Sequence, residues 1–392
     1  MWPTVTYEEL TWSSSAPLSR RMRAKQPRTY CSSIVAPIAE QDVALSAPVV
    51  TSLTEATAAI ARFDQKHAGI VAPFAPLLLR GESFASSRIE QLSSSARRIL
   101  EAEAFQTGRG NAALISANTT MMRKAIHTRH IDSESIRAMH ALLLGSESPH
   151  IAGVFRNEPV WIGGSDAHPV GALFVPPHHS YVQSLLEDLT EFIRREDIPA
   201  LAKAALAHAQ FETIHPFADG NGRTGRALVH AILGQSSLTT NGVLPISAAL
   251  LSDTQRYFAA LDSYRDGDVA AIISLFSDAA VSATMLGSQL GSQLMALRTE
   301  WAESTTLRAD SAARKILDYL IQQPVVDAAG VAEHLNVSPA TARRALERLE
   351  DDGIVRSSQV TKAKRAWHAP EVLELLDAFA DANRRLTFRP DL

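Results

Sequence analysis

The chain reads His215-Pro-Phe-Ala-Asp-Gly-Asn-Gly-Arg-Thr-Gly-Arg226 near its middle, and no other stretch combines so many reactive groups. It holds an imidazole, a carboxylate, glycines around an asparagine, and two guanidinium groups. Alanine-rich residues before it and apolar periodicity after it predict two helices, Ala200–Thr213 and Arg223–Leu233, joined by this loop. Because the free amides and the dipole of a helix N-terminus favour negative charge, the loop is a candidate anion site.

The residue types in this loop fit a nucleotide phosphate site. Gly220, Asn221 and Gly222 can take left-handed conformations that turn successive N–H groups around an anion. Asp219 supplies an oxygen ligand of the kind that Mg²⁺ takes together with substrate phosphates. His215 is a candidate general base beside them. A plain Asp-Gly-Asn-Gly turn is the alternative, which the joint occurrence of these groups between two helices disfavours.

This segment resembles the signature of the Fic family, His-x-Phe-x-Asp/Glu-Gly-Asn-Gly-Arg-x-x-Arg, and matches it at every specified position. The resemblance implies transfer of AMP from ATP to a hydroxyl side chain (Ser, Thr or Tyr) of a target protein. It also implies that His215 deprotonates that hydroxyl, that Phe217 is a buried anchor, and that Asp219 holds Mg²⁺ on the nucleotide. The residues that it places around the ATP phosphates, with the last one on the γ-phosphate, are Gly220, Asn221, Gly222, Arg223, Thr224, Gly225 and Arg226.

A second resemblance lies upstream, in Ser86-Ser-Arg-Ile-Glu-Gln91. It is similar to the family's inhibitory-helix motif, Ser/Thr-x-x-x-Glu-Gly/Asn, whose Glu forms a salt bridge with the second motif arginine and prevents competent ATP binding. Ser86 and Glu90 match the pattern, whereas Gln91 departs from it. Glutamine permits a helix to continue where glycine would end it. The resemblance implies a built-in inhibitor in which Glu90 pairs with Arg226; the alternative is an exposed glutamate on an ordinary helix.

Two weaker resemblances concern the substrate side of the site. Phe155-Arg156 followed by strand-like Val160–Ile162 and Leu173–Val175 looks like the family's flap hairpin, which aligns a target segment by strand addition. Tyr257 and Phe258 resemble an aromatic pair that helps to close the adenine pocket. The alternatives are a surface hairpin without a function and two packed aromatic side chains.

The composition fits an ordinary globular protein of 392 residues, with 46% hydrophobic residues, 20% charged residues and a formal net charge of −4. This charge excludes a generally basic nucleic-acid coat. The single cysteine, Cys31, excludes an intrachain disulfide and fits a cytoplasmic location. No uninterrupted apolar run of ~18 residues or secretory leader is evident, so we expect no membrane partner.

The periodicity predicts a mainly α fold. The resemblance implies that its core is a Fic helical bundle with a small β-hairpin flap, and the pattern after it resembles a C-terminal winged helix-turn-helix domain. Cap signals at Ser133 and at Ser252-Asp-Thr-Gln255 predict two of the helix starts. The predicted helices before the winged helix, with further ones after Ser252, include Leu53–Phe63, Ser86–Phe105, Asn111–His127, Ser133–Leu144 and Ser180–Arg195. The predicted domains are an N-terminal arm (1–48), a Fic domain (49–300) with its inhibitory helix at about 83–95, the winged helix (311–370) and a C-terminal helix and tail (371–392).

The winged helix is predicted from a local pattern with a clear helix start. Ser338 is an N-cap followed by Pro339 at the first helical position. The elements expected around them are helices Ala312–Ile321, Val326–His334 and Thr341–Asp352 and strands Ile354–Ser358 and Lys364–His368. The candidate DNA contacts are Thr341, Arg343 and Arg344 on the recognition helix and Lys362, Lys364 and Arg365 on the wing.

Acidic residues nearly balance basic ones in the winged helix, so two roles stay open for this domain: DNA binding and protein interaction. A homodimer would strengthen DNA binding.

Three functions stay open for the whole protein. The leading function is autoinhibited adenylylation. Its alternatives are removal of AMP from modified proteins, with Glu90 orienting a water, and a DNA-binding regulator whose Fic core senses nucleotide.

Overall fold

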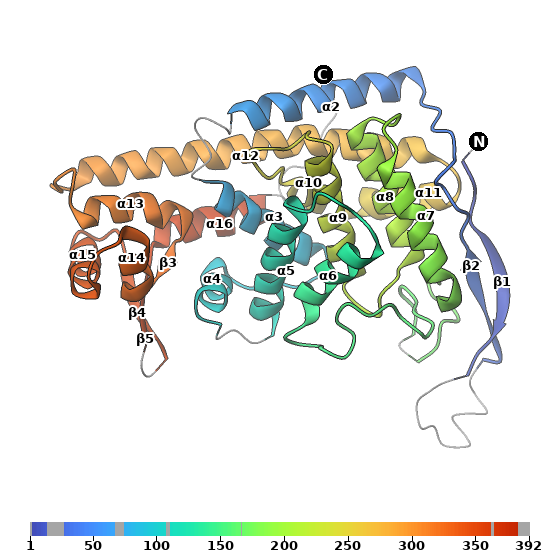
Figure 1. The fold of residues 1–392 in the computed structure, drawn as a ribbon, viewed down its shortest axis with the longest axis horizontal. Helices are drawn as coiled ribbons and strands as arrows, with labels where there is room; N and C mark the ends of the chain where they lie inside the picture. The colour runs from blue at the N-terminus through green and yellow to red at the C-terminus, as the bar shows by residue number, and fades with distance from the viewer. Residues whose placement is uncertain are drawn as a thin grey trace. The chain divides into compact units, whose positions relative to one another are not determined.

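The computed structural model describes residues 2–13, 27–66, 74–106, 110–165, 167–361 and 364–382. These residues are mainly helical and carry small antiparallel sheets (Figure 1). They form two compact units. The first unit comprises Met1–Thr54, His127–Ser236 and Gln255–Phe276, and the second comprises Glu55–Ile126, Ser237–Thr254 and Ser277–Leu392. The predicted domain boundaries stay predictions.

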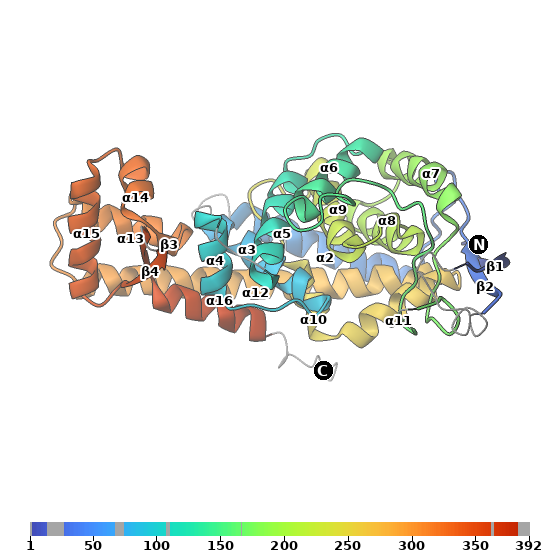
Figure 2. The ribbon, with the colours of Figure 1, turned by 90° about the horizontal axis from the view of Figure 1, so that it is seen from below.

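The first unit is built around α8 (Ala200–Ile214), whose residues are buried from Leu201 to its end. A helix that is buried on all sides has no polar face, and its many alanines allow neighbours to approach closely. Helices α9 (Asn221–Gln235) and α7 (Val182–Arg194) both pack against it (Figure 2). Helix α6 (Ser133–Leu144) packs in turn against α9, so the loop between α8 and α9 lies within a helical frame.

The described strands of the first unit are β1 (Thr6–Thr11) and β2 (Thr29–Ile34), which pair antiparallel. Strand β1 was not predicted from the sequence. The flap is less regular than predicted, because its two arms share only a bridge between Ile162 and Phe174. The arm after Phe174 bonds β2 instead, since the Val175 carbonyl accepts the Ser33 amide at 3.0 Å.

The second unit centres on α3 (Ala75–Ile89), which is buried over most of its length. The helices packed on it include α5 (Asn111–Ile126), α10 (Ile246–Ser252) and α16 (Pro370–Ala382). The predicted helix Ser86–Phe105 is wrong, because α3 ends at Ile89 and α4 (Ala96–Phe105) begins seven residues later.

The end of α3 explains this error. The Gln91 amide bonds the Arg88 carbonyl at 2.9 Å, and the Leu92 amide bonds the Ser87 carbonyl at 3.1 Å. These two bonds form a Schellman motif, in which the residue after the cap takes a left-handed conformation. Gln91 takes that conformation, with φ of 61°, although it is not a glycine.

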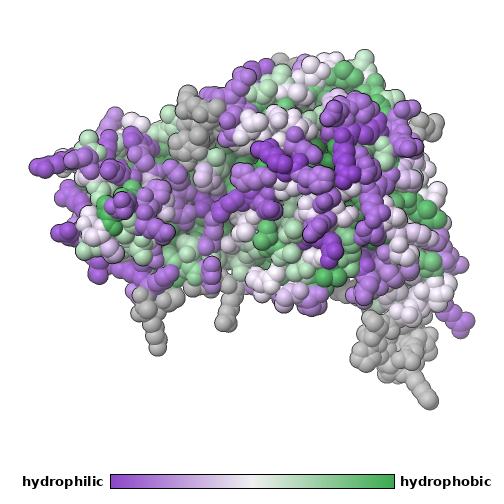
Figure 3. Space-filling model, viewed as in Figure 1, coloured by the Kyte–Doolittle hydropathy of each residue, from purple (hydrophilic) through white to green (hydrophobic). Residues whose placement is uncertain are grey.

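The predicted winged helix is confirmed in outline, and its described surface in Figure 3 is largely hydrophilic. Its elements are α13 (Ala312–Gln322), β3 (Val325–Val326), α14 (Ala328–Leu335), α15 (Pro339–Asp351), β4 (Arg356–Thr361) and β5 (Lys364–His368). Ser338 caps α15 by accepting the Thr341 amide at 3.1 Å, as expected. The strand order is β3-β5-β4, and the short β3 was not foreseen.

Helix α3 is tied to the C-terminal elements by arginine side chains. Arg80, 3% exposed, donates to the Gln322 carbonyl at the end of α13 at 2.7 Å and to the Gln323 side chain at 2.5 Å. Arg88 donates to the Ala380 carbonyl of α16 at 2.8 Å. The winged helix and α3 therefore belong to one packed unit.

Two further helices differ from expectation. Helix α11 (Thr254–Arg265) follows α10 almost directly, and the Ser252 hydroxyl donates to the Ala249 carbonyl at 2.6 Å, so the predicted cap at Ser252 is wrong. At α6 the cap is Asp132, one residue before the predicted Ser133.

Helix α12 (Val269–Ser304) is long and apolar enough to cross a membrane by length and composition, with a mean hydropathy of 1.8 in its most apolar window. Serine and glycine interrupt its apolar runs, which is why uninterrupted apolar residues do not reveal it. Half of that window is buried inside the protein, and the core helix of a soluble protein passes the same test.

Candidate active site

The first motif residue, His215, lies at the end of α8. It takes a left-handed conformation with φ of 50° and ψ of 62°, and its amide bonds the Phe211 carbonyl at 2.8 Å. This turn ends the helix and directs the chain into the loop. The Arg156 side chain donates to the His215 carbonyl at 2.8 Å, so the turn is held from outside the motif.

The loop after His215 is closed by Asn221. Its amide group donates to the Phe217 carbonyl and its oxygen accepts the Phe217 amide, both at 2.9 Å. Gly220 precedes α9 with φ of 74°, and a Cβ there would lie 2.9 Å from the Leu143 side chain. Only glycine combines this backbone conformation with this close approach. Helix α9 begins at Asn221, so the expected placement of the loop at a helix N-terminus is confirmed.

His140 of α6 supports the loop and was not singled out from the sequence. Its ring stacks on Phe217 with centroids 3.7 Å apart. The Gly153 amide donates to its Nδ1 at 2.9 Å, so its Nε2 carries the proton and donates to the Asp219 carbonyl at 2.9 Å. Burial lowers the pKa of His140, which keeps the ring neutral in this role. A lone histidine on an amphipathic helix carries no signal of such a contact.

The basic groups of the motif are buried on α9. Arg223 is 2% exposed and Arg226 is 1% exposed. Between them, Gly225 packs closely on α8, because a Cβ there would lie 2.8 Å from a carboxylate oxygen of Glu212 and 3.0 Å from Phe211. Thr224 donates its hydroxyl to the Gly220 carbonyl at 2.8 Å, which fixes the first turn of the helix.

The electrostatic surroundings keep His215 neutral. Burial, followed by the positive charges of Arg156 and Arg265, lowers the pKa of His215 to about 3. Its Nδ1 lies 3.4 Å from the Glu212 carbonyl and 3.8 Å from the Glu212 carboxylate. The His215 side chain is 19% exposed, so a substrate hydroxyl can still reach the ring. A neutral imidazole is the form that accepts a proton.

Asp219 is the exposed acidic group of the loop. Its side chain is 62% exposed, one oxygen accepts the Gly220 amide at 2.6 Å, and the same oxygen lies 3.7 Å from the Arg223 guanidinium. No cluster of three or more metal-ligating side chains occurs among the residues that the structure describes. A single carboxylate fits a Mg²⁺ ion that arrives with nucleotide phosphates, and fits a resident metal poorly.

The predicted adenine-pocket residues differ in exposure. Tyr257 is 1% exposed and its hydroxyl bonds His208 Nε2 at 2.7 Å, whereas Phe258 is 51% exposed. Their rings lie 5.2 Å apart. Contact of either with a nucleotide stays a prediction, as does the pairing of Glu90 with Arg226, because Ser86 and Glu90 lie in the second unit.

Several predicted DNA contacts are engaged within the winged helix. Arg343 pairs with Glu347 at 2.9 Å. Arg365 pairs with Glu350 at 3.0 Å and lies over the Trp367 ring. Thr341 bonds Ser338, and Lys364 lies over the Phe105 ring. Arg344 is exposed, and Lys362 falls outside the described residues.

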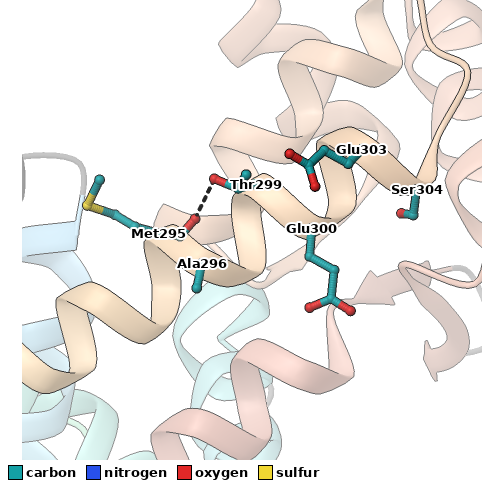
Figure 4. A pocket seen from close by; sticks show the side chains of 6 residues that line it. All are labelled: Met295, Ala296, Thr299, Glu300, Glu303 and Ser304. Atoms are coloured by element: carbon teal, nitrogen blue, oxygen red, sulfur yellow. Dashed lines mark hydrogen bonds between the residues drawn. The ribbon is translucent and has the colours of Figure 1, made fainter.

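A hollow elsewhere in the structure lacks the chemistry of a nucleotide site. It is lined by residues of α12 alone, among them Glu300 and Glu303 (Figure 4). The described lining carries carboxylates and no basic group, so it would repel phosphate.

Comparison with known proteins agrees with the motif and the fold. The Fic/DOC family model matches residues 130–233, and a winged helix-turn-helix DNA-binding model matches residues 310–356. The protein adenylyltransferase fic-1 of Caenorhabditis briggsae is 32% identical over 162 residues, which cover 41% of this chain and 29% of that protein. A probable protein adenylyltransferase of Aquifex aeolicus is 34% identical over 120 residues, which cover 30% of this chain and 35% of that protein.

The chain thus spans about a third of the length of these relatives. A solved structure of a Fic family protein from Desulfovibrio desulfuricans shares the fold with a TM-score of 0.53 at 18% identity, covering 83% of this chain and 97% of the other. The chain therefore contains a Fic/DOC family domain and a C-terminal winged helix-turn-helix domain.

Proposed function

We propose that this protein is an autoinhibited adenylyltransferase that transfers AMP from ATP to a serine, threonine or tyrosine hydroxyl of a target protein. One observation carries the proposal: His215 ends α8 at the start of the loop that leads into the glycine-rich N-terminus of α9, where Arg223 and Arg226 are buried. The adenylyltransferase relatives support the same class of reaction.

The proposed reaction assigns a step to each part of the loop. His215 takes the proton of the target hydroxyl, and the resulting oxygen attacks the α-phosphorus of ATP. A new oxygen–phosphorus bond forms, the bond from the α-phosphorus to the bridging oxygen breaks, and pyrophosphate leaves. The amides at the start of α9 and the guanidinium groups of Arg223 and Arg226 would stabilise the charge that develops on the phosphates.

Asp219 is the residue that would hold Mg²⁺ in this reaction. When bound, the ion would neutralise negative charge on the ATP phosphates. The fit rests on an exposed carboxylate beside the amide groups of the loop.

The proposal is tested by incubating the full chain with ATP and Mg²⁺ and recording its mass, because self-modification adds one AMP. We expect His215→Ala to remove this labelling while ATP still binds, since loss of a general base costs about 10²–10⁴-fold. His130→Ala is the control, because the His130 side chain is 69% exposed and pairs with Asp132 at the surface. In the Glu90→Gly chain, in which the proposed inhibition is removed, equal labelling with and without His215→Ala would contradict the proposal.

Autoinhibition by Glu90 is a separate part of the proposal, supported by the motif and by its position at the end of α3. Glu90→Gly is expected to raise labelling, because the proposed pairing of the Glu90 carboxylate with Arg226 would no longer compete with the γ-phosphate of ATP. Glu90→Asp keeps the charge and serves as the control. Loss of AMP from a pre-modified protein in the parent chain, but not in Glu90→Gly, would instead favour the removal reaction.

We further propose that the protein acts in the cytoplasm and that its winged helix contacts DNA. The winged-helix match supports the second statement.

A further inference from the structure

The side chain of Arg156 lies outside the motif but ends against its first residues. It is 5% exposed. Its Nε donates to the His215 carbonyl at 2.8 Å, and its Nη2 donates to the carbonyls of Ile214 at 3.2 Å and Pro177 at 2.6 Å. Its backbone amide donates to the Pro216 carbonyl at 3.0 Å. One residue thus bonds three consecutive residues around the candidate base.

The turn at His215 needs such support. A left-handed conformation costs a non-glycine residue about 1–2 kcal/mol. The last carbonyls of α8 also lack partners within the helix, since the chain leaves the helical path at His215. A guanidinium group offers five donors in a fixed plane, so it can bond several carbonyls at once. An ammonium group is a compact point charge and cannot reproduce this arrangement.

The charge of Arg156 stays directed at the site. Its side-chain hydrogen bonds end on main-chain carbonyls, the fourth being Glu158 at 3.4 Å, and carbonyls at a helix C-terminus favour a cation. After burial, this charge is the largest influence that lowers the pKa of His215. The other charged groups that face the imidazole are Glu212 on α8 and Arg265 on α11.

We propose that Arg156 is the positioning residue of the candidate base: it fixes the turn that aims His215 and keeps a positive charge beside the ring. The inference rests on the proposed adenylyl transfer. Arg156 lies at the start of the segment that resembles a target-binding flap, but its side chain is buried and acts on the motif.

Two substitutions separate geometry from charge. Arg156→Lys keeps the charge and loses the planar donors, so we expect kcat for self-labelling to fall up to about 100-fold, as for a displacement of about 1 Å. The KM for ATP should stay within about twofold of the parent value. The pH profile of kcat should keep its shape, because the positive charge is retained. Arg156→Gln loses the charge as well, so the pKa of His215, followed by NMR of the labelled imidazole, should rise toward its ordinary value.

The matched control is Arg195→Lys. Arg195 lies at the end of α7 in the same unit. Its side chain also donates to main-chain carbonyls, those of Ala39 and Gln41. Thermal unfolding of each variant establishes that it is folded before rates are compared.

The outcomes distinguish this inference from the function on which it rests. If the parent chain labels itself and His215→Ala does not, but Arg156→Lys keeps the parent rate, Arg156 has no positioning role. An unchanged His215 pKa in Arg156→Gln overturns the electrostatic part. If the parent chain shows no transfer under any condition, the proposed function fails instead.

Discussion

At the residue scale, Asp219 is the proposed Mg²⁺ ligand, and its side chain is 62% exposed. Its oxygen is already engaged by the Gly220 amide at 2.6 Å, which orients the carboxylate at the loop. Mg²⁺ usually keeps several waters and takes one or two carboxylates with substrate phosphates.

We therefore expect Asp219→Ala to lower AMP transfer at every Mg²⁺ concentration, and calorimetry of the nucleotide-free chain to detect no tight Mg²⁺ binding. Asp197→Ala is the control, because Asp197 is similarly exposed and pairs with an arginine. Tight binding of Mg²⁺ without ATP would show that the site is a resident metal centre.

His208 predicts a pH dependence of stability. It is fully buried, and burial, together with the charge of Arg226, lowers its pKa from 6.5 to about 3. Between these two pKa values the unfolded chain binds a proton at His208 and the folded chain does not. The contribution of neutral His208 to the free energy of unfolding is therefore complete above about pH 6.5, and it falls by about 1.4 kcal/mol per pH unit as the pH decreases toward 3.

We expect His208→Gln to weaken the fall of the unfolding free energy between these pH values, measured by denaturant titration at a series of pH values. The control substitution is His130→Gln, at a side chain that is 69% exposed. Equal slopes for the parent and His208→Gln would mean that His208 titrates normally in the fold.

At the element scale, the end of α3 can be compared directly with the end of α15. Both are Schellman motifs, and the second places Gly353 at φ of 80° where the first places Gln91 at 61°. A Cβ at Gly353 would meet nothing within 4 Å, so the cost of a side chain at this position comes from the left-handed backbone conformation.

Reciprocal substitutions test this comparison. Gln91→Gly should raise the free energy of unfolding by about 1 kcal/mol, because glycine takes the left-handed conformation without steric cost. Gly353→Gln should lower it by a similar amount. Urea unfolding of both variants checks the signs, and a destabilised Gln91→Gly would show that the Gln91 side chain makes a compensating contact.

At the scale of the whole molecule, α3 and the winged helix fall in the same compact unit. DNA binding is therefore best measured on the full chain, because the contacts of Arg80 and Arg88 connect α3 to the C-terminal elements.

Among the candidate contacts, we expect Arg344→Ala to weaken DNA binding without a loss of stability, because this side chain is exposed on α15. Arg365→Ala should lower stability as well, since Arg365 bonds Glu350 and Ser357. Titration against random and promoter-upstream duplexes at several salt concentrations tests whether these side chains bind phosphate. Removing one phosphate-binding side chain reduces the slope of log K against log salt concentration by about one. No binding at low salt would make the domain a protein-interaction module.

The sequence by itself determined the local features of this protein. The motif from His215 to Arg226, the helix boundary around it, and the cap of α15 at Ser338 follow from residues within a few positions of one another. Local spacing carries this information because the preferences for helix ends, turns and anion sites depend on neighbouring residues.

Only the tertiary structure decided which distant residues support the motif. Arg156 lies 59 positions before His215 and His140 lies 79 positions before Asp219, yet both bond the loop directly. It also decided that α3 stops at Ile89, since glutamine has no intrinsic preference for the left-handed turn that follows. At the His215 loop the supporting contacts come from elements that only folding brings together. At the end of α3 local hydrogen bonds hold a left-handed conformation that glutamine does not prefer.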